Sequence, residues 1–362
     1  MKAARYHAAG DVRVEDVPVP TPGPGEVQVR VALNGICGSD LHEFFDGPRA
    51  VPMEPHPLTG VRAPVVLGHE TAGHVNELGA GVSGVSVGDL VVVDPLRNCG
   101  RCPACRVGWD NLCHRLAMHG YSTGGGGLAE LTVVPADRLH ATPAGMTPTQ
   151  AALVEPLSIA AHAVGRWSDR TGTSAAVFGA GPIGIAVLLT LRAAGSEDVW
   201  VVEPAPERRR IAESLGAHGI DPAAGSPSEQ LREATGGAGV DVAFDTAGAP
   251  TSFTDAVSSL SKRGTVVVVA SGRNQVVAPL PELVRSELTV RTTYASCGEF
   301  DDVIAGMEAG RFPLEGWVTT LALDDLVEGF HRLREGRDIK ILVDPWAPAQ
   351  WTSTDDLGGG AP

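Results

Sequence analysis

The sequence predicts an α/β chain with two domains, a β-rich lobe and a doubly wound parallel sheet. The first third is rich in Val, Gly and Pro and contains short segments that alternate apolar and polar residues. From about residue 173 to 292, strand-like apolar runs alternate with helical stretches, which is typical of parallel strands joined by helices. With 362 residues and 43% hydrophobic residues, the chain can bury a core in each domain.

The β-rich lobe is expected over residues 1–155. Its clearest strand is 27–33, where apolar and polar residues alternate as on a half-buried strand. The Pro-Gly-Pro-Gly segment at 22–25 and the turn at Gly84 interrupt such strands, which favours a compact, barrel-like lobe. The Ala- and Leu-rich stretch from 151 to 165 predicts a helix where the lobe ends.

The parallel-sheet domain is expected over residues 156–292. Residues 293–345 are then expected to pack back on the first lobe, and residues 346–362 to form a mobile, loop-like tail. Four strands of the sheet are predicted, with helical stretches between them: Ala175–Gly179, Asp198–Glu203, Val240–Asp245 and Gly264–Ala270.

Charge and hydropathy exclude several classes of protein. The formal net charge of −15 argues against a nucleic-acid partner, because a surface that binds phosphates needs an excess of Lys and Arg. The first residues lack the apolar core of a signal peptide. The longest uncharged run, 173–191, carries Gly and Pro in a pattern that predicts a buried strand, turn and helix rather than a membrane span. We therefore expect a cytoplasmic protein without membrane contact.

Four cysteines lie close together in the first domain, with the spacing C-x2-C-x2-C-x7-C: Cys99, Cys102, Cys105 and Cys113. Four thiolates satisfy the tetrahedral preference of zinc. Disulfides are the alternative, but such close spacing in a chain without a secretory signal favours metal binding. The sequence therefore predicts a structural zinc lobe at about residues 95–115.

A glycine-rich turn in the second domain predicts a dinucleotide site. The segment Gly179-Ala-Gly181-Pro182-Ile183-Gly184 follows a predicted strand and opens an apolar helix. Such a turn lets a pyrophosphate approach the backbone and the start of the helix. The alternative is a cluster of packing glycines in some other α/β sheet.

An acidic residue, Glu203, ends the next predicted strand about 20 residues further on. Glu203 can accept hydrogen bonds from ribose hydroxyls and repel a 2′-phosphate, which favours NAD over NADP. Arginines at 208–210 could instead neutralise a 2′-phosphate, although such a run is more often a solvated helix face.

Two further segments supply candidate ligands for a second zinc. They are Gly35-Ile-Cys37-Gly-Ser-Asp-Leu-His42 and Leu67-Gly-His69-Glu70. Cys and His are good zinc ligands, and Glu70 or Glu155 can add an oxygen. An incomplete set of protein ligands leaves room for a substrate oxygen, as catalytic zinc requires. Alone, Cys37 would be a small core residue and His69 a loop histidine.

These motifs together resemble the zinc-dependent medium-chain alcohol dehydrogenases, from Met1 to about Pro345. Within that family the chain is most similar to the butanediol (acetoin) dehydrogenases and their polyol dehydrogenase relatives. The narrower resemblance is carried by residues 41–48, 55–60, 63–70 and 154–158. It implies a GroES-like catalytic domain, a Rossmann NAD-binding domain and two zinc ions per subunit.

The resemblance also implies roles for single residues around the catalytic zinc. Cys37 and His69 would be ligands, and Glu155 stands where many relatives have a second cysteine. Either Glu155 or Glu70 would fill the remaining protein position. Asp40 would orient His69.

A proton relay and cofactor contacts are implied in the same way. Ser39 would pass the alcohol proton to the cofactor ribose and then to His42, which hands it to solvent. An ordinary surface histidine is the alternative for His42. Arg208 would approach the adenosine ribose or phosphate, and the segment 245–248, with Thr246, would line the nicotinamide half.

The expected function is hydride transfer between a secondary alcohol and NAD. The favoured substrate is a vicinal diol or a 2-hydroxyketone. A dehydrogenase of a sugar alcohol, amino alcohol or natural-product intermediate is the alternative. A nucleotide-binding protein without catalysis is a rival from another class, and the set of Cys37, Ser39, His42, His69 and Glu70 argues against it. The resemblance implies a homodimer or homotetramer.

Overall fold

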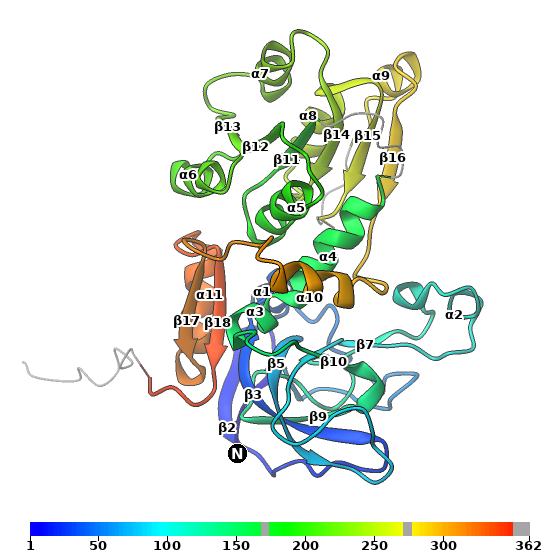
Figure 1. The fold of residues 1–362 in the computed structure, drawn as a ribbon, viewed down its shortest axis with the longest axis vertical. Coiled ribbons are helices and arrows are strands. Elements are labelled where there is room, and N and C mark those ends of the chain that lie inside the picture. Colours follow the sequence, from blue (N-terminus) through cyan, green and yellow to red (C-terminus); the bar gives the residue numbers. More distant parts are fainter. Residues whose placement is uncertain (168–173, 271–276, 350–362) are drawn as a thin grey trace, which may run out of the picture. The chain divides into compact units, whose positions relative to one another are not determined.

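Two compact units make up the chain in the computed structural model, which describes residues 1–167, 174–270 and 277–349 (Figure 1). The first unit comprises Met1–Leu153 and the chain from Val318 onward, and the second comprises Val154–Trp317. The return to the first unit, expected at residue 293, lies at Val318. The structure places it later because α10 (Phe300–Glu308) packs on α4 (Val154–Gly165) inside the second unit.

The first unit is built mainly from antiparallel strands. Among the described residues, its larger sheet has the order β10-β6-β5-β3-β18-β17, with β9 paired to β3. Only β17 and β18 in it run parallel to each other. The strands are β3 (Glu26–Gly35), β5 (Glu70–Leu78), β6 (Leu90–Val93), β9 (Leu131–Pro135), β10 (Leu139–Ala141), β17 (Val318–Ala322) and β18 (Lys340–Asp344).

Smaller elements complete the first unit. A second sheet has the order β2-β1-β4, and β7 pairs with β8. These strands are β1 (Lys2–Ala8), β2 (Asp11–Asp16), β4 (Val65–Val66), β7 (Leu96–Arg97) and β8 (Ala117–Met118). The helices are α1 (Gly38–Asp46), α2 (Pro103–Arg106), α3 (Pro148–Ala152) and α11 (Leu326–Arg334), with 3-10 turns at Asp110–Leu112, Ala136–Arg138 and Leu323–Asp325.

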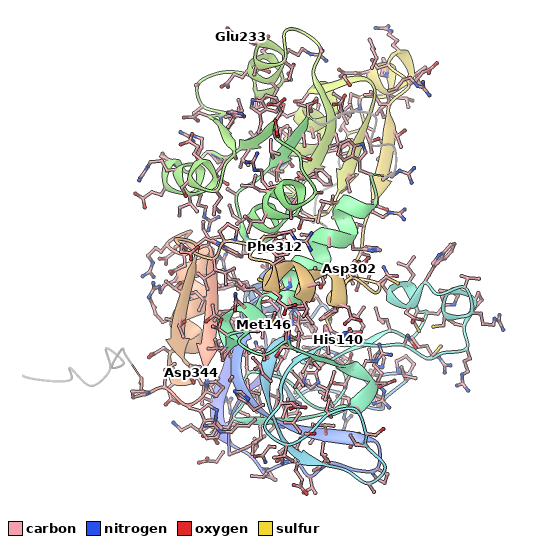
Figure 2. The ribbon with its side chains drawn as sticks, in the orientation of Figure 1. His140, Met146, Glu233, Asp302, Phe312 and Asp344 are labelled. Carbon is pink, nitrogen blue, oxygen red and sulfur yellow. The ribbon has the colours of Figure 1, made fainter. Side chains whose placement is uncertain are left out.

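Valines form one of the cores of this unit, because alternate residues of its strands face the same side. Buried members of this cluster are Val27, Val29, Val75, Val91, Val93 and Val134. A second apolar cluster includes Tyr6, Ile36, Phe44, Leu128 and Phe330. Side chains fill the space between the strands and helices within each unit (Figure 2).

The second unit contains a parallel sheet with the strand order β13-β12-β11-β14-β15-β16. The order reverses beside β11, as in doubly wound dinucleotide-binding folds. Its strands are β11 (Ala175–Phe178), β12 (Val199–Val202), β13 (His218–Ile220), β14 (Val240–Asp245), β15 (Leu260–Val268) and β16 (Thr289–Thr292). Besides α4 and α10, its helices are α5 (Pro182–Ala193), α6 (Pro206–Ser214), α7 (Pro227–Ala234), α8 (Ser252–Ser258) and α9 (Leu280–Arg285).

Two expectations about local structure need comment. The helix expected over 151–165 is two helices, α3 and α4, which are separated by Leu153, the residue that precedes the start of the second unit in the sequence. Most of the tail, from residue 350, lies outside the described residues. Trp346, at the start of that tail, donates from Nε1 to the carbonyl of Val31 at 2.8 Å, and the Arg30 guanidinium lies 3.9 Å from its ring centre.

The uncharged run predicted to form a strand, turn and helix contains β11 and most of α5. Within the described ranges, no helix is both long and apolar enough to cross a bilayer.

Candidate active site and metal centres

Helix α1 begins at the first candidate ligand. Cys37 is its N-cap residue, and the Cys37 backbone N–H donates to Asp40 Oδ2 at 2.9 Å. The Cys37 side chain accepts in return from the Asp40 backbone, so the two residues form a capping box. The start of this helix therefore fixes Cys37 and Asp40 side by side.

Strand pairing brings the second motif to the same place. In the β3–β5 ladder Gly35 pairs with Glu70, which sets Cys37 close to His69 and Glu70. Gly68 has φ of 99°, a conformation that favours glycine, and a Cβ there would lie 2.5 Å from the backbone N of Leu128. Glycine at this position thus allows the turn that carries His69 into the site.

Cys37, His69 and Glu70 form a buried cluster whose ligand atoms all lie within 4.8 Å of one another. His69 is 3% exposed and Glu70 1%. Burial, and next the nearby Glu70, raise the pKa of the Cys37 thiol to about 12. His69 Nδ1 lies 3.7 Å from Asp40 Oδ1, and it has no hydrogen-bond partner within the described ranges. This donor set of thiol, imidazole and carboxylate fits zinc, whose charge would favour the thiolate.

A buried lysine that we did not identify from sequence contacts this cluster. The Lys340 ammonium donates to Glu70 Oε2 and, at 2.9 Å, to the carbonyl of Ile36. Gly35 makes room for the pair, because a Cβ there would overlap the Glu70 carboxylate. The ion pair with Lys340 therefore fixes the position of Glu70 Oε2.

Glu155 belongs to the second unit, in the first turn of α4, where it is 5% exposed. The described cluster therefore brings together three of the four predicted ligands. The choice between Glu70 and Glu155 stays a prediction.

Ser39 and His42, the residues of the expected relay, lie three positions apart on α1. Ser39 Oγ is 3.4 Å from His69 Nε2 and 2.8 Å from the Tyr121 hydroxyl oxygen. His42 is exposed, and its Nδ1 lies 3.8 Å from Asp46. The relay itself stays a prediction.

Tyr121 is the second residue that we missed. Its hydroxyl also lies 2.8 Å from Asp40 Oδ1, and its ring centre is 5.0 Å from that of His69. Burial, and next Asp40, raise the pKa of Tyr121 well above its ordinary value. Burial likewise raises the pKa of Asp40, and His69 opposes that shift. A lone tyrosine among glycines at 120–127 carries no signal that would have identified it.

The four cysteines of the predicted lobe also come together, with sulfurs within 4.8 Å of one another. All of them are free thiols. Backbone N–H groups point at the sulfurs: Cys99 N lies 3.2 Å and Arg115 N 3.4 Å from Cys113 Sγ. Hydrogen bonds, first that from the Arg101 backbone, lower the pKa of Cys99 to about 6. Four converging thiols with N–H donors aimed at them fit a structural zinc ion.

The glycine turn lies between β11 and α5. Gly179 has φ of 104°, and a Cβ on Gly184 would overlap the carbonyl of Gly179, so both positions need glycine. Gly181 is the N-cap of α5 and Pro182 its first residue, followed by Ile183. Because the backbone N–H groups at the start of a helix lack helical partners, this turn can hold a pyrophosphate.

Glu203 follows β12, at the same edge of the sheet. It is buried, and its carboxylate accepts from the backbone N–H of Ala180 at 2.7 Å and of Ala205 at 2.9 Å. Thr246, after β14, donates to the carbonyl of Phe178 at 2.8 Å. The carboxyl ends of parallel strands meet at one edge, so the glycine turn, Glu203 and Thr246 are neighbours there.

The arginine run lies on α6. Arg209 forms an ion pair with Asp221 at 2.8 Å, and Arg210 with Glu207 at 2.8 Å. Arg208 lies beside them on the same helix. Two of the three arginines are therefore paired with carboxylates.

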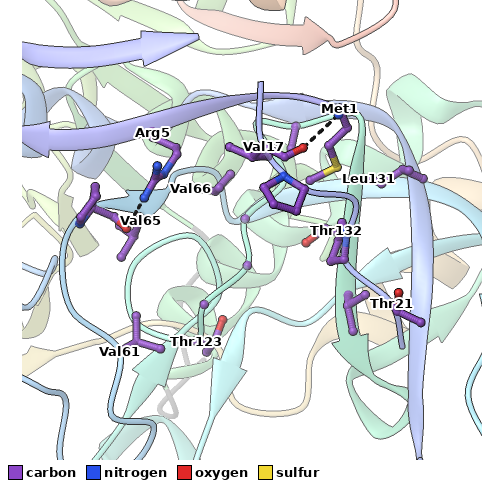
Figure 3. Close-up of a pocket in the computed structure, with 18 of the residues that line it drawn as sticks. Met1, Arg5, Val17, Thr21, Val61, Val65, Val66, Thr123, Leu131 and Thr132 are labelled. Carbon is purple, nitrogen blue, oxygen red and sulfur yellow. Dashed lines mark hydrogen bonds between the residues drawn. The ribbon is translucent and has the colours of Figure 1, made fainter. Parts of the chain in front are cut away.

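A cavity of about 510 Å³ lies elsewhere in the first unit (Figure 3). Its walls include Arg5, Val66, Thr123, Leu131 and Thr132. Arg5 donates there to the carbonyl of Pro64 at 3.3 Å and pairs with Glu15. Cys37, His69 and Glu70 are not among its lining residues.

Comparison with known proteins supports both expected domains. Residues 23–144 match the family model of the alcohol dehydrogenase GroES-like domain, and residues 182–309 match that of zinc-binding dehydrogenases. These matches confirm the predicted fold class.

Similar proteins span nearly the whole chain. (R,R)-butanediol dehydrogenase of Bacillus subtilis is 40% identical over 350 residues, which cover 95% of this chain and 100% of that protein. The crystal structure of 2R,3R-butanediol dehydrogenase from Bacillus subtilis matches with a TM-score of 0.90 over 95% of this chain and 99% of that one. D-xylulose reductase A of Aspergillus oryzae is 32% identical and covers 92% of this chain and 93% of that protein.

Proposed function

This chain belongs to the zinc-dependent medium-chain alcohol dehydrogenases, and on that premise we propose that it interconverts a vicinal diol and a 2-hydroxyketone, such as butanediol and acetoin, with NAD. As a member of that family it is an oxidoreductase acting on CH–OH donors, with zinc and a nicotinamide cofactor. The observation that carries the proposal is the cluster of Cys37, His69 and Glu70, with Ser39 Oγ 3.4 Å from His69 Nε2.

Cys37 and His69, with Glu70 or Glu155, would hold the catalytic zinc, and the four clustered cysteines a second, structural one. When bound, zinc supplies a Lewis acid that makes an alcohol hydroxyl more acidic, and NAD supplies the hydride acceptor. Asp40 lies against His69 Nδ1 and orients the imidazole. Ser39 Oγ accepts the proton of the substrate hydroxyl and releases its own hydroxyl proton, which His42, exposed on the same helix, returns to water.

NAD is the proposed cofactor, and Glu203 is the main support for it. Each Glu203 oxygen accepts one backbone hydrogen bond and keeps a further lone pair for a ribose hydroxyl. A 2′-phosphate near this carboxylate would be repelled. The ion pairs of Arg209 and Arg210 further support NAD, because paired arginines compensate a phosphate poorly.

The diol is favoured over longer polyols by the comparisons. The butanediol dehydrogenase relative is 40% identical, against 32% for D-xylulose reductase A. That second relative keeps a sugar alcohol as the alternative substrate.

We also propose that copies of the chain associate as a homodimer or homotetramer. Strand β16 lies at the end of the parallel sheet, so one of its sides is free of sheet partners within the described ranges. Exposed apolar side chains gather on and beside it: Leu280, Val284 and Val290. Free thiols in both cysteine clusters are consistent with a reducing, cytoplasmic compartment.

A substrate panel tests the proposed reaction. Butanediol stereoisomers, sorbitol and xylitol are each incubated with NAD, and NADH absorbance is followed; acetoin with NADH tests the reverse direction. We expect kcat/KM for one butanediol isomer to exceed that for either polyol by at least about tenfold. A higher value for a polyol would assign the alternative function, and no turnover of any alcohol by zinc-loaded protein would contradict both.

A further inference from the structure

Tyr121 makes two short hydrogen bonds beside the metal ligands. Its hydroxyl oxygen lies 2.8 Å from Ser39 Oγ and 2.8 Å from Asp40 Oδ1. Tyr121 is 2% exposed and Asp40 0%, so water does not compete freely for these contacts. A phenol carries one proton, and it can therefore donate to only one of its two neighbours at a time.

The surroundings of Asp40 decide which neighbour receives that proton. Asp40 Oδ2 accepts from the Cys37 backbone N–H at 2.9 Å, and His69 Nδ1 lies 3.7 Å from Oδ1. The Cys37 backbone N–H therefore faces Oδ2 and the Tyr121 hydroxyl faces Oδ1, which is the arrangement for a carboxylate that only accepts. Tyr121 then donates to Asp40, and the Ser39 hydroxyl donates to Tyr121.

From this order we propose that Tyr121 is a positioning residue that sets the direction of the Ser39 hydroxyl. The Ser39 proton points at Tyr121, so the lone pairs of Ser39 Oγ are left for a donor on the side of His69. An incoming alcohol hydroxyl is such a donor. This inference rests on the proposed function, because the acceptor role of Ser39 belongs to it.

The same geometry shows which variant isolates the effect. The Tyr121 ring packs against the imidazole of His69, with ring centres 5.0 Å apart. Tyr121→Phe keeps this packing and removes only the hydroxyl, so Ser39 Oγ loses its internal partner. A matched control is Tyr6→Phe, because Tyr6 is also fully buried in the first unit and its hydroxyl has no hydrogen-bond partner within the described ranges.

The experiment is a double-mutant cycle between Tyr121→Phe and Ser39→Ala on zinc-loaded protein. We expect Tyr121→Phe to lower kcat by at least about tenfold. The reason is that Ser39, as the proposed proton acceptor, contributes to the rate only when its hydroxyl is correctly oriented. The KM for the alcohol should stay unchanged, and so should the zinc content of the protein. In the Ser39→Ala background the same substitution should cost nothing further, and Tyr6→Phe should keep the wild-type kcat.

Equal losses from Tyr121→Phe with and without Ser39 would overturn the proposal, because Tyr121 would then act independently of the serine. Unchanged kcat, or a loss of zinc, would overturn it too. Crystal structures of zinc-loaded wild type and Tyr121→Phe give a readout that needs no turnover. We expect a different Ser39 side-chain rotamer in the variant, and an unchanged rotamer contradicts the positioning role. Failure of the proposed function would be recognised separately, because the wild-type protein would then oxidise no alcohol.

Discussion

The ammonium of Lys340 on β18 lies against the carboxylate of Glu70 on β5, and each side chain is only 1% exposed. The two residues are 270 positions apart in the sequence, yet Lys340 contacts a residue of the candidate zinc cluster. Taking two charges out of water is costly, so each depends on the other.

Lys340→Met is expected to lower the free energy of unfolding by about 3–5 kcal/mol, because the substitution leaves the Glu70 carboxylate buried without its partner. Urea denaturation of the chelator-treated protein measures the change, because bound zinc would give Glu70 another partner. Lys2→Met is the matched control, since Lys2 pairs with Asp324 on the surface and its loss should change stability little. Similar losses of stability in both variants would show that the buried ion pair contributes no more to stability than the surface pair does.

Cys102→Ser is expected to reduce the zinc content from two equivalents per chain towards one and to lower the thermal stability. The reason is that one of four converging thiols is lost while Cys37 and His69 are untouched. Metal analysis of protein purified without chelator, together with a melting curve, tests this. Cys297→Ser, outside both clusters, should keep both zinc ions. A Cys102→Ser protein with two zinc ions and the wild-type melting temperature would sink the structural role.

Glu203→Gln is expected to reduce the preference for NAD. We expect the wild type to favour NAD over NADP by at least about tenfold in kcat/KM, or roughly 1.4 kcal/mol. Glutamine keeps one acceptor oxygen but removes the charge that repels a 2′-phosphate, so the ratio should fall in the variant. Glu229→Gln, at an exposed position on α7 of the same unit, is the control. Equal kcat/KM values for the two cofactors in the wild type would mean that the neighbouring arginines offset the repulsion between Glu203 and a 2′-phosphate.

His42→Ala is expected to slow alcohol oxidation most at and below neutral pH, where hydroxide cannot replace the missing base. Zinc content and NAD affinity should change little, because His42 is exposed and lies outside the ligand cluster. pH profiles of kcat from pH 6 to 9 measure the effect, with the exposed His218→Ala as control. An unaltered profile would leave His42 as a surface histidine. His69→Ala, by contrast, should lose zinc and activity together.

The parts of the molecule that short motifs specify were predictable. The C-x2-C-x2-C-x7-C spacing and the glycine turn each lie within one short segment, and their residues come together in the structure as expected. Strand β14 has the predicted bounds, Val240–Asp245. Strand β15 begins at Leu260 rather than 264, where its register with β14 shifts.

The residues that we missed act over long separations. Tyr121 is 81 positions from Asp40, and Lys340 is 270 positions from Glu70. Each is an ordinary residue type without a surrounding motif, and only the packing of distant strands gives it a partner. Sequence patterns record local spacing, whereas these contacts depend on how β18 and the loop before β9 reach α1 and β5.

The capping box that joins Cys37 and Asp40 has a practical consequence for the empty protein. Its hydrogen bonds involve the backbone and two side chains of the same helical turn, so they exist whether or not a cation is present. The Cys37 thiol therefore keeps its position after chelation. The apoprotein retains this part of the metal site in an ordered conformation. Reconstitution should then proceed by simple capture from solution, without a refolding step.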